Sequence, residues 1–152
     1  MRILNGIKKI IAIYMAIIFF VSLDRCLKVL APANQDQQFN LIGEILKFNY
    51  QANYNIAFSL PLAGQVLVIL LILIILALVS LGLFYWFKHK YDRLAPLCLI
   101  ILGAGSNLLD RLKYGYVIDY LDLKYFTVFN LADAMIVTGV ILLIIILNKK
   151  SA

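Results

Sequence analysis

Two aspartates in the last third of the chain have a setting that could support acid–base chemistry. Asp119 lies in the stretch YVIDYLD, and Asp133 lies in FNLAD, at the entrance of a strongly apolar run. Neither has an adjacent basic residue that would make it half of an obvious ion pair. Two carboxyl groups that share one proton can activate a water and protonate the reacting group, as peptide hydrolysis requires. Asp119 and Asp133 are therefore the candidate catalytic pair.

The composition shows what kind of elements must position this pair. Of the 152 residues, 64% are hydrophobic and only 14% are charged. The mean hydropathy of +0.94 is far above that of an ordinary soluble domain. The sequence therefore predicts an all-α integral membrane protein.

Four apolar runs are long enough to cross a hydrocarbon core, which needs about 20 helical residues. They extend approximately over Ile10 to Leu30, Leu60 to Phe87, Ala95 to Leu112 and Asn130 to Leu147. The first run meets Asp24 and Arg25 instead of a small-residue cleavage site, so we expect an uncleaved span and not a signal peptide. The prediction is a four-transmembrane-helix bundle that forms a single membrane-embedded domain over residues 1–152.

The basic residues predict the orientation of these spans. They cluster before the first run, between the second and third runs, and at the C-terminus. Because cytoplasmic loops carry an excess of Lys and Arg, both termini are expected in the cytoplasm, with residues 31–59 and 113–129 outside. These cytoplasmic clusters account for most of the formal net charge of +6, so we expect no nucleic-acid partner.

Polar side chains gather at the predicted outer ends of three runs. An ionisable residue inside a span costs roughly 2.5 to 3.5 kcal/mol on insertion scales and usually faces the bundle interior or a watery cavity. Besides Asp133, the polar residues of these clusters are Asp24, Lys28, Asn107, Asp110, Arg111 and Asn130. Two interpretations stay open for them. Asp24 with Lys28, and Asp110 with Arg111, could be ion pairs that only pin helices, or all could belong to a functional site.

A transporter or proton-relay subunit is the rival function from another class, because intramembrane carboxylates can line a conduit. A conduit needs polar residues through the full membrane thickness. The inner halves of the last three spans are almost wholly apolar, which favours a site that faces the outer surface.

The segment Lys47 to Ser59 alternates apolar and polar residues, which predicts a short strand or hairpin at the membrane surface. Asn53 lies on its polar face, either as a site residue or as one solvated asparagine among several. Asn130 likewise has two interpretations, since it could contact substrate or cap the helix that follows. A carboxylate at Asp133, in the first turn of that helix, would meet the positive end of the helix dipole, which favours its ionised form.

Five motifs, in order, resemble those of the lipoprotein signal peptidases, also called signal peptidase II. They are DRCLK, NYNIAFS, GSNLLDR, YVIDYLD and FNLAD, beginning at Asp24, Asn53, Gly105, Tyr116 and Phe129, and they extend over nearly the whole chain. The resemblance implies an aspartic endopeptidase of the bacterial cytoplasmic (inner) membrane that removes the signal peptide from diacylglyceryl-modified prolipoproteins, cutting before the lipidated cysteine.

The resemblance also implies roles for individual residues. Asp119 and Asp133 match the family's two catalytic aspartates. The positions that match its substrate-binding or site-supporting residues are Asp24, Lys28, Asn53, Asn107, Arg111 and Asn130, and Asp110 stands within the same motif. Further expectations are a small extracytoplasmic β-cradle, membrane lipids as neighbours, a monomer, sensitivity to globomycin, and no metal or cofactor.

Three positions depart from the family pattern. Asn55 stands where a glycine usually follows the strand asparagine, Ala52 replaces the usual basic residue before it, and Ser106 replaces the usual glycine before Asn107. These changes affect the expected backbone geometry and substrate contacts, while both aspartate motifs are intact. A family member that binds lipoproteins without cleaving them is the remaining alternative.

Overall fold

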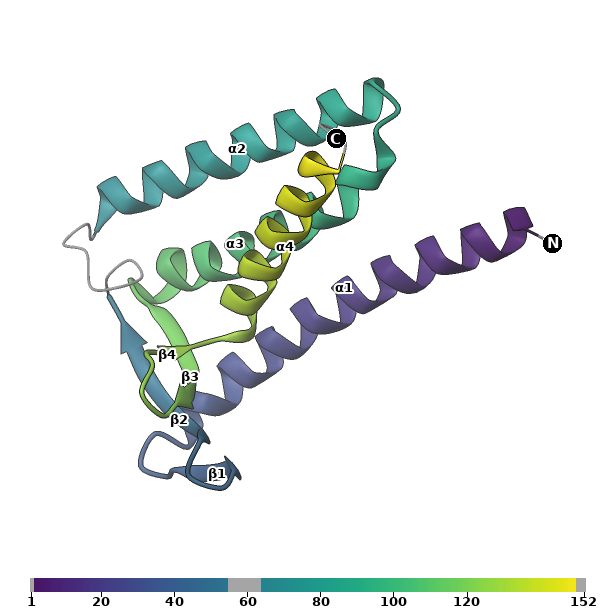
Figure 1. Ribbon diagram of the computed structural model, residues 1–152. Helices are drawn as coiled ribbons and strands as arrows, with labels where there is room; N and C mark the ends of the chain where they lie inside the picture. Colours follow the sequence, from purple (N-terminus) through teal and green to yellow (C-terminus); the bar gives the residue numbers. More distant parts are fainter. Residues whose placement is uncertain (1, 55–63, 150–152) are drawn as a thin grey trace.

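The computed structural model describes residues 2–54 and 64–149, and its largest elements are four long helices. These are α1 (Arg2–Ala33), α2 (Gln65–Phe87), α3 (Leu94–Tyr114) and α4 (Leu131–Asn148), with a short 3-10 helix, η2 (Tyr91–Arg93), before α3. Among the described residues, four helices are long and apolar enough to cross a membrane. Figure 1 shows α3 and α4 between α1 and α2. The predicted four-helix architecture is confirmed.

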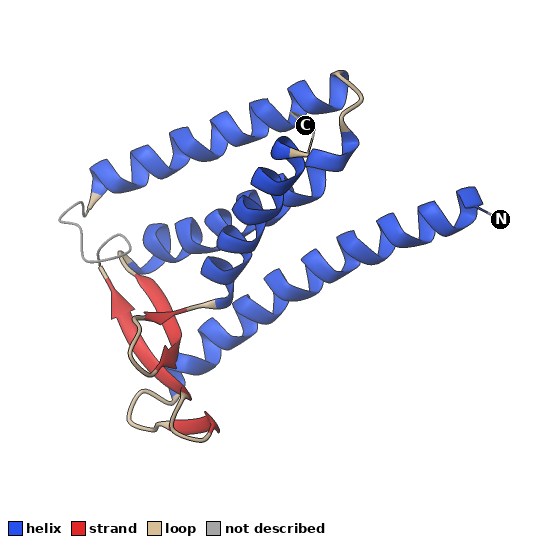
Figure 2. Cartoon of the chain, viewed as in Figure 1, coloured by secondary structure: helices blue, strands red, loops and turns tan. Residues whose placement is uncertain are grey.

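A four-stranded antiparallel sheet covers one end of the helices (Figure 2). Its strands are β1 (Phe39–Ile42), β2 (Leu46–Asn53), β3 (Val117–Leu123) and β4 (Val128–Phe129), and their spatial order is the order of the sequence. The expected small β element is therefore present, and β2 begins within one residue of the predicted strand. The predicted strand segment 55–59 and the start of the second span at 60–63 lie outside the described residues.

The region between the third and fourth spans differs from the expected loop. It forms β3, which pairs with β2 so that Gln51 lies opposite Asp119, and then β4. The first four residues of β3 are all buried, and because successive side chains point to opposite faces of a sheet, the strand is buried on both faces there. A strand buried on both faces lacks the alternation that marked β2, so its sequence has no period-two signal.

Local capping signals determine where α3 and α4 end and begin. Gly115 ends α3 with φ of 82°, a left-handed conformation that a Cβ disfavours, and its N–H donates to the carbonyl of Arg111. Asn130 starts α4 as the N-cap of a capping box with Asp133. These two signals bracket the strands and place Asp119 on the sheet and Asp133 in the first turn of α4.

Glycines allow α3 and α4 to approach closely. A Cβ added at Gly103 would lie 2.6 Å from the carbonyl oxygen of Ala132, and one at Gly139 would lie 2.7 Å from that of Pro96. Small residues at helix contacts are typical of membrane bundles, where close packing drives association. The ends of α3 and α4 that carry polar residues are thereby held against each other beneath the sheet.

Candidate active site

Asn130 bridges the two aspartates. Its side-chain amide Nδ2 donates to Oδ1 of Asp119 at 2.6 Å, and its Oδ1 accepts from the backbone N–H of Asp133 at 2.9 Å. The backbone N–H of Asn130 donates in turn to Oδ2 of Asp133 at 3.3 Å. Because Oδ1 faces an N–H donor, the amide orientation is determined and its N–H groups must face Asp119. Asn130 therefore caps α4, which confirms one of its two interpretations, and it also holds Asp119. Its contact with substrate stays a prediction.

Each aspartate receives a second hydrogen bond from an asparagine on a different element. Asn53, at the end of β2, donates to Oδ2 of Asp119 at 2.9 Å. Asn107 of α3 donates to Oδ1 of Asp133 at 2.7 Å. Amide donors stabilise a carboxylate without adding a charge, so both groups keep their acid–base capacity.

Lys28 determines the orientation of Asn107. The Nζ of Lys28 donates to Oδ1 of Asn107 at 2.7 Å, and a lysine ammonium can only donate. The NH₂ group of Asn107 must therefore face Asp133. Lys28 is fully enclosed and also forms salt bridges with Asp110 at 2.8 Å and Asp24 at 3.3 Å.

Arg25 and Ser106 complete this buried charge cluster. Arg25 forms a salt bridge with Asp110 at 2.6 Å and donates to Oγ of Ser106 at 3.3 Å. The hydroxyl of Ser106 donates to Oδ2 of Asp24 at 2.6 Å. Asp110, for which the sequence suggested Arg111 as partner, is thus paired with Arg25 and Lys28 of α1. Adjacent residues point away from each other on a helix, and this favours partners from a neighbouring helix.

Tyr120 and Asp24 join the sheet to the start of α4. The hydroxyl of Tyr120 donates to Oδ1 of Asp24 at 2.9 Å and accepts the backbone N–H of Leu131 at 3.1 Å. The same Asp24 oxygen accepts the N–H of Ala132 at 3.1 Å. The first N–H groups of a helix have no intrahelical partner, and here side chains from β3 and α1 satisfy them. Burial, together with the negative charge of Asp24, raises the pKa of Tyr120 above its usual range.

The environment of Asp119 favours its protonated form. Its side chain is almost completely buried, and burial raises the pKa of this carboxyl from 3.8 to about 6. The negative charge of Asp133 also raises the pKa of Asp119, while the hydrogen bonds from Asn53 and Asn130 lower it. A carboxyl group with a pKa near neutral can act as an acid in the physiological range.

Comparisons with known proteins identify the family to which the chain belongs. The sequence pattern of the family described as "Signal peptidase (SPase) II" matches residues 16–149. The chain belongs to this signal peptidase II family. A lipoprotein signal peptidase of Halothermothrix orenii is 32% identical over 142 residues, which is 91% of this chain and 96% of that protein. One of Streptococcus thermophilus is 37% identical over 147 residues, covering 92% and 94%.

A solved structure has the same fold. A bacterial membrane enzyme determined at 2.3 Å resolution superimposes with a TM-score of 0.78 and 24% identity, covering 93% of this chain and 90% of its own. The four apolar helices and membership of the signal peptidase II family together make the protein a multi-pass bacterial membrane protein.

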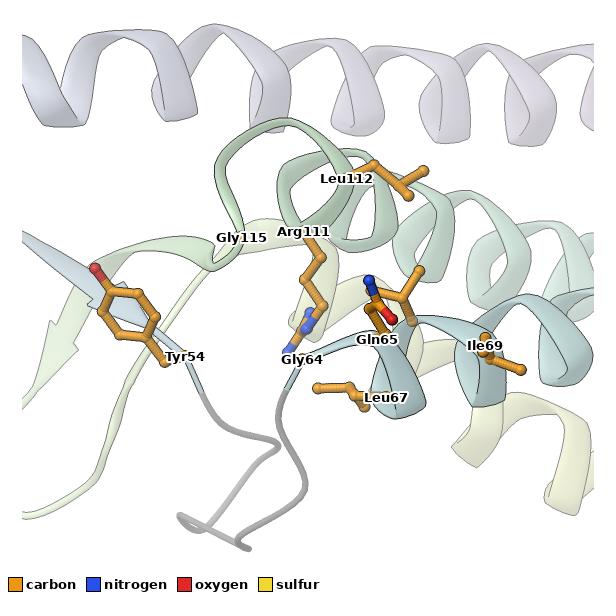
Figure 3. A pocket seen from close by; sticks show the side chains of 9 residues that line it. Tyr54, Gly64, Gln65, Leu67, Ile69, Arg111, Leu112 and Gly115 are labelled. Carbon is orange, nitrogen blue, oxygen red and sulfur yellow. The ribbon is translucent and has the colours of Figure 1, made fainter.

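A cavity of about 450 Å³ lies between the start of α2 and the end of α3. Its lining includes Tyr54, Leu67 and Arg111, and Figure 3 shows the Arg111 side chain extending toward Gly64. The positive charge of Arg111 is within electrostatic reach of Asp133, Asp119 and Asp110. Arg111 therefore both lines this cavity and interacts electrostatically with the two aspartates.

Of the nine candidate residues, eight are joined by hydrogen bonds or salt bridges in one cluster, and Arg111 lies at its edge. Sequence reasoning missed Arg25, Ser106 and Tyr120. Arg25 follows Asp24 and Tyr120 follows Asp119, so both lay within the quoted motifs. Ser106 appeared only as a departure from the signal peptidase II pattern, but its hydroxyl supplies a hydrogen bond that a glycine could not.

Proposed function

We propose that this protein is an aspartic endopeptidase that removes signal peptides from lipid-modified prolipoproteins, with Asp119 and Asp133 as its catalytic residues. The observation that carries the proposal is the bridge through Asn130, which binds a buried carboxyl group on β3 and a second carboxyl group in the first turn of α4. Membership of the signal peptidase II family supports the substrate class.

The two carboxyl groups take different roles in the proposed reaction. Asp133, with amide donors and the positive end of α4 beside it, acts as the ionised base that removes a proton from the attacking water. Asp119, whose pKa is raised to about 6, donates its proton to the carbonyl oxygen of the scissile bond. Transfer of the proton on Asp133 to the leaving nitrogen then breaks the C–N bond, and a hydroxyl proton of the tetrahedral intermediate returns to Asp119 as the new carboxyl group forms.

The substrate is proposed to reach this pair from the membrane. Its lipid chains lie in the bilayer beside the helices, and the peptide enters at the end of the bundle covered by the sheet, which faces outward. Both termini then lie in the cytoplasm, and the cut falls before the lipidated cysteine. One chain supplies both aspartates, so a monomer is sufficient, and globomycin is expected to compete with substrate.

The test is cleavage of a diacylglyceryl-modified prolipoprotein by the purified protein in detergent. Asp119→Asn and Asp133→Asn are each expected to lower kcat by roughly 10²- to 10⁴-fold, the usual contribution of a general acid or base. Asp122→Asn is the matched control on the same strand, because Asp122 accepts from Asn49 and, among the described residues, no hydrogen bond joins it to either catalytic aspartate. Near-normal cleavage by either catalytic variant, or none by folded wild-type protein, would contradict the proposal.

A further inference from the structure

Asp24 of α1 holds both elements that carry the candidate catalytic aspartates. Its Oδ1 accepts the backbone N–H of Ala132, the residue before Asp133. The same oxygen accepts the hydroxyl of Tyr120, the residue after Asp119. The terminal torsion of an aspartate side chain is broad, so the orientation of this carboxylate depends on the donors at its other oxygen, Oδ2. Whatever holds Oδ2 therefore helps to place the first turn of α4.

Ser106 of α3 is the closer of the two donors found at Oδ2 among the described residues. Its hydroxyl oxygen lies 2.6 Å from Oδ2 of Asp24, whereas Nζ of Lys28 lies 3.3 Å away. The ammonium of Lys28 lies closer to Asp110 and Asn107, at 2.8 Å and 2.7 Å. Ser106 and Asp24 are both buried, and a hydrogen bond is stronger in such surroundings than in water. Ser106 is therefore the main partner of this oxygen.

Arg25 determines the direction in which the Ser106 hydroxyl donates. Its Nη1 lies 3.3 Å from Oγ of Ser106 and 3.2 Å from the backbone carbonyl oxygen of the same residue. A guanidinium can only donate, so the single proton of the hydroxyl must point to Asp24. Arg25 and Asp24 are adjacent on α1 and do not face each other, because consecutive residues point in different directions on a helix. Ser106 connects the two from the neighbouring helix.

We propose that Ser106 is a positioning residue, which acts through Asp24 to hold the first turn of α4, and with it Asp133, in place for catalysis. The chain of hydrogen bonds runs from the hydroxyl of Ser106 to Asp24 and on to the N–H of Ala132. Glycine, the residue usual at this position in the signal peptidase II pattern, has no hydroxyl to begin such a chain. The effect on catalysis rests on the proposed function, whereas the effect on the N–H of Ala132 does not.

The test compares Ser106→Ala and Ser106→Gly with the wild-type protein by two measurements in detergent micelles. The first is NMR of the isotope-labelled protein, which reads the proton chemical shift and the hydrogen exchange of the Ala132 amide. The second is kcat and KM for cleavage of a diacylglyceryl-modified prolipoprotein. Ser80→Ala on α2 is the matched control, because its exposed hydroxyl donates to the carbonyl of Leu76 within the same helix.

In both Ser106 variants the N–H of Ala132 is expected to exchange about tenfold faster, because the first N–H groups of a helix have no intrahelical partner and this one depends on its bond to a charged group. Its proton resonance should move upfield. The exchange of Val140, in the middle of α4, should stay as in wild type. We expect kcat to fall by about tenfold, because the catalytic group is displaced, while KM stays within about twofold.

An unchanged Ala132 amide in both variants would overturn the proposal, and so would equal acceleration at Ala132 and Val140, which indicates a general loss of stability. A changed Ala132 amide with wild-type kcat would also overturn it, since Asp133 would then not depend on this chain of hydrogen bonds. If the wild-type protein does not cleave the substrate, the proposed function fails, and the NMR measurement alone decides whether Ser106 holds the start of α4.

Discussion

Asp119 is the residue whose chemistry depends most directly on its neighbours. Burial raises its pKa to about 6, and the hydrogen bonds from Asn53 and Asn130 act in the opposite direction. If Asp119 is the acid, cleavage requires its protonated form, so activity declines as the pH rises through the pKa that this group shows in the pair. The decline is a property of the coupled carboxyl groups, because the charge of Asp133 also acts on Asp119.

Asn53→Ala should move this alkaline decline to higher pH. Asn53 donates to the carboxylate and lowers the pKa of Asp119, so removing the donor raises that pKa further. A hydrogen bond to a charged group contributes roughly 1.5 to 3 kcal/mol, so we expect a displacement of about one pH unit or more. The measurement is kcat/KM against pH. Asn49→Ala is the control, since Asn49 on the same strand donates to Asp122. An unchanged profile in Asn53→Ala would argue against Asp119 as the titrating acid.

At the scale of elements, the contact between α3 and α4 sets the separation of Asn107 and Asp133. Gly103 lies one turn before Asn107, and a Cβ there would approach the carbonyl oxygen of Ala132 to 2.6 Å and Cγ1 of Ile136 to 2.9 Å. A backbone oxygen cannot rotate away, so the start of α4 must move. The hydrogen bond of 2.7 Å between Asn107 and Asp133 would lengthen with it.

Gly103→Ala is therefore expected to lower kcat by about tenfold to a hundredfold, as displacements near 1 Å do in catalytic sites, and to lower the Tm in detergent. Gly105→Ala is the matched control on the same helix, because a Cβ at Gly105 meets nothing within 4 Å in the described residues. Its activity should stay within about twofold of wild type, since alanine also favours the helix. Equal activity of the two variants would show that α3 and α4 tolerate a larger separation.

At the scale of the whole molecule, one buried charge cluster joins α1, α3, the sheet and the start of α4. Lys28 is central to it, since its ammonium pairs with both Asp24 and Asp110, and all three side chains are enclosed. Removing one partner of a buried ion pair leaves an uncompensated charge and typically costs about 3 to 5 kcal/mol. The structure thus depends on Lys28 far more than on a lysine at the surface.

Lys28→Met should strongly lower the free energy of unfolding, whereas Lys124→Met should cost about 1 kcal/mol or less. Lys124 pairs with Glu44 at 3.7 Å with both side chains exposed. Adding Asp110→Asn to Lys28→Met should recover part of the stability but not the activity, because Asn107 still lacks the donor that orients it toward Asp133. Thermal unfolding in detergent and the cleavage assay measure the two effects. Recovery of both together would show that Lys28 is only structural.

Much of the fold was predictable because its signals are local. Apolar runs of sufficient length identified all four helices, and the ends of α3 and α4 lie within a few residues of the predicted ones. Alternation identified β2. The strand that carries Asp119 was not predicted, because burial on both faces removes the alternation from Val117 to Tyr120. β1 has only four residues, FNLI, and so short a segment without strict alternation has no period-two signal to detect.

The sequence by itself determined the membrane character, the four spans, the candidate aspartates and the asparagines near them, since these depend on residue type and on spacing along single helices. Only the tertiary structure decided the partners. Asp24 and the N–H of Ala132 are 108 residues apart, and Lys28 and Asn107 are 79 apart. No local pattern carries such pairings. They arise when close packing of glycine-containing helices and a strand buried on both faces bring the polar ends together, where each buried polar group must find a partner.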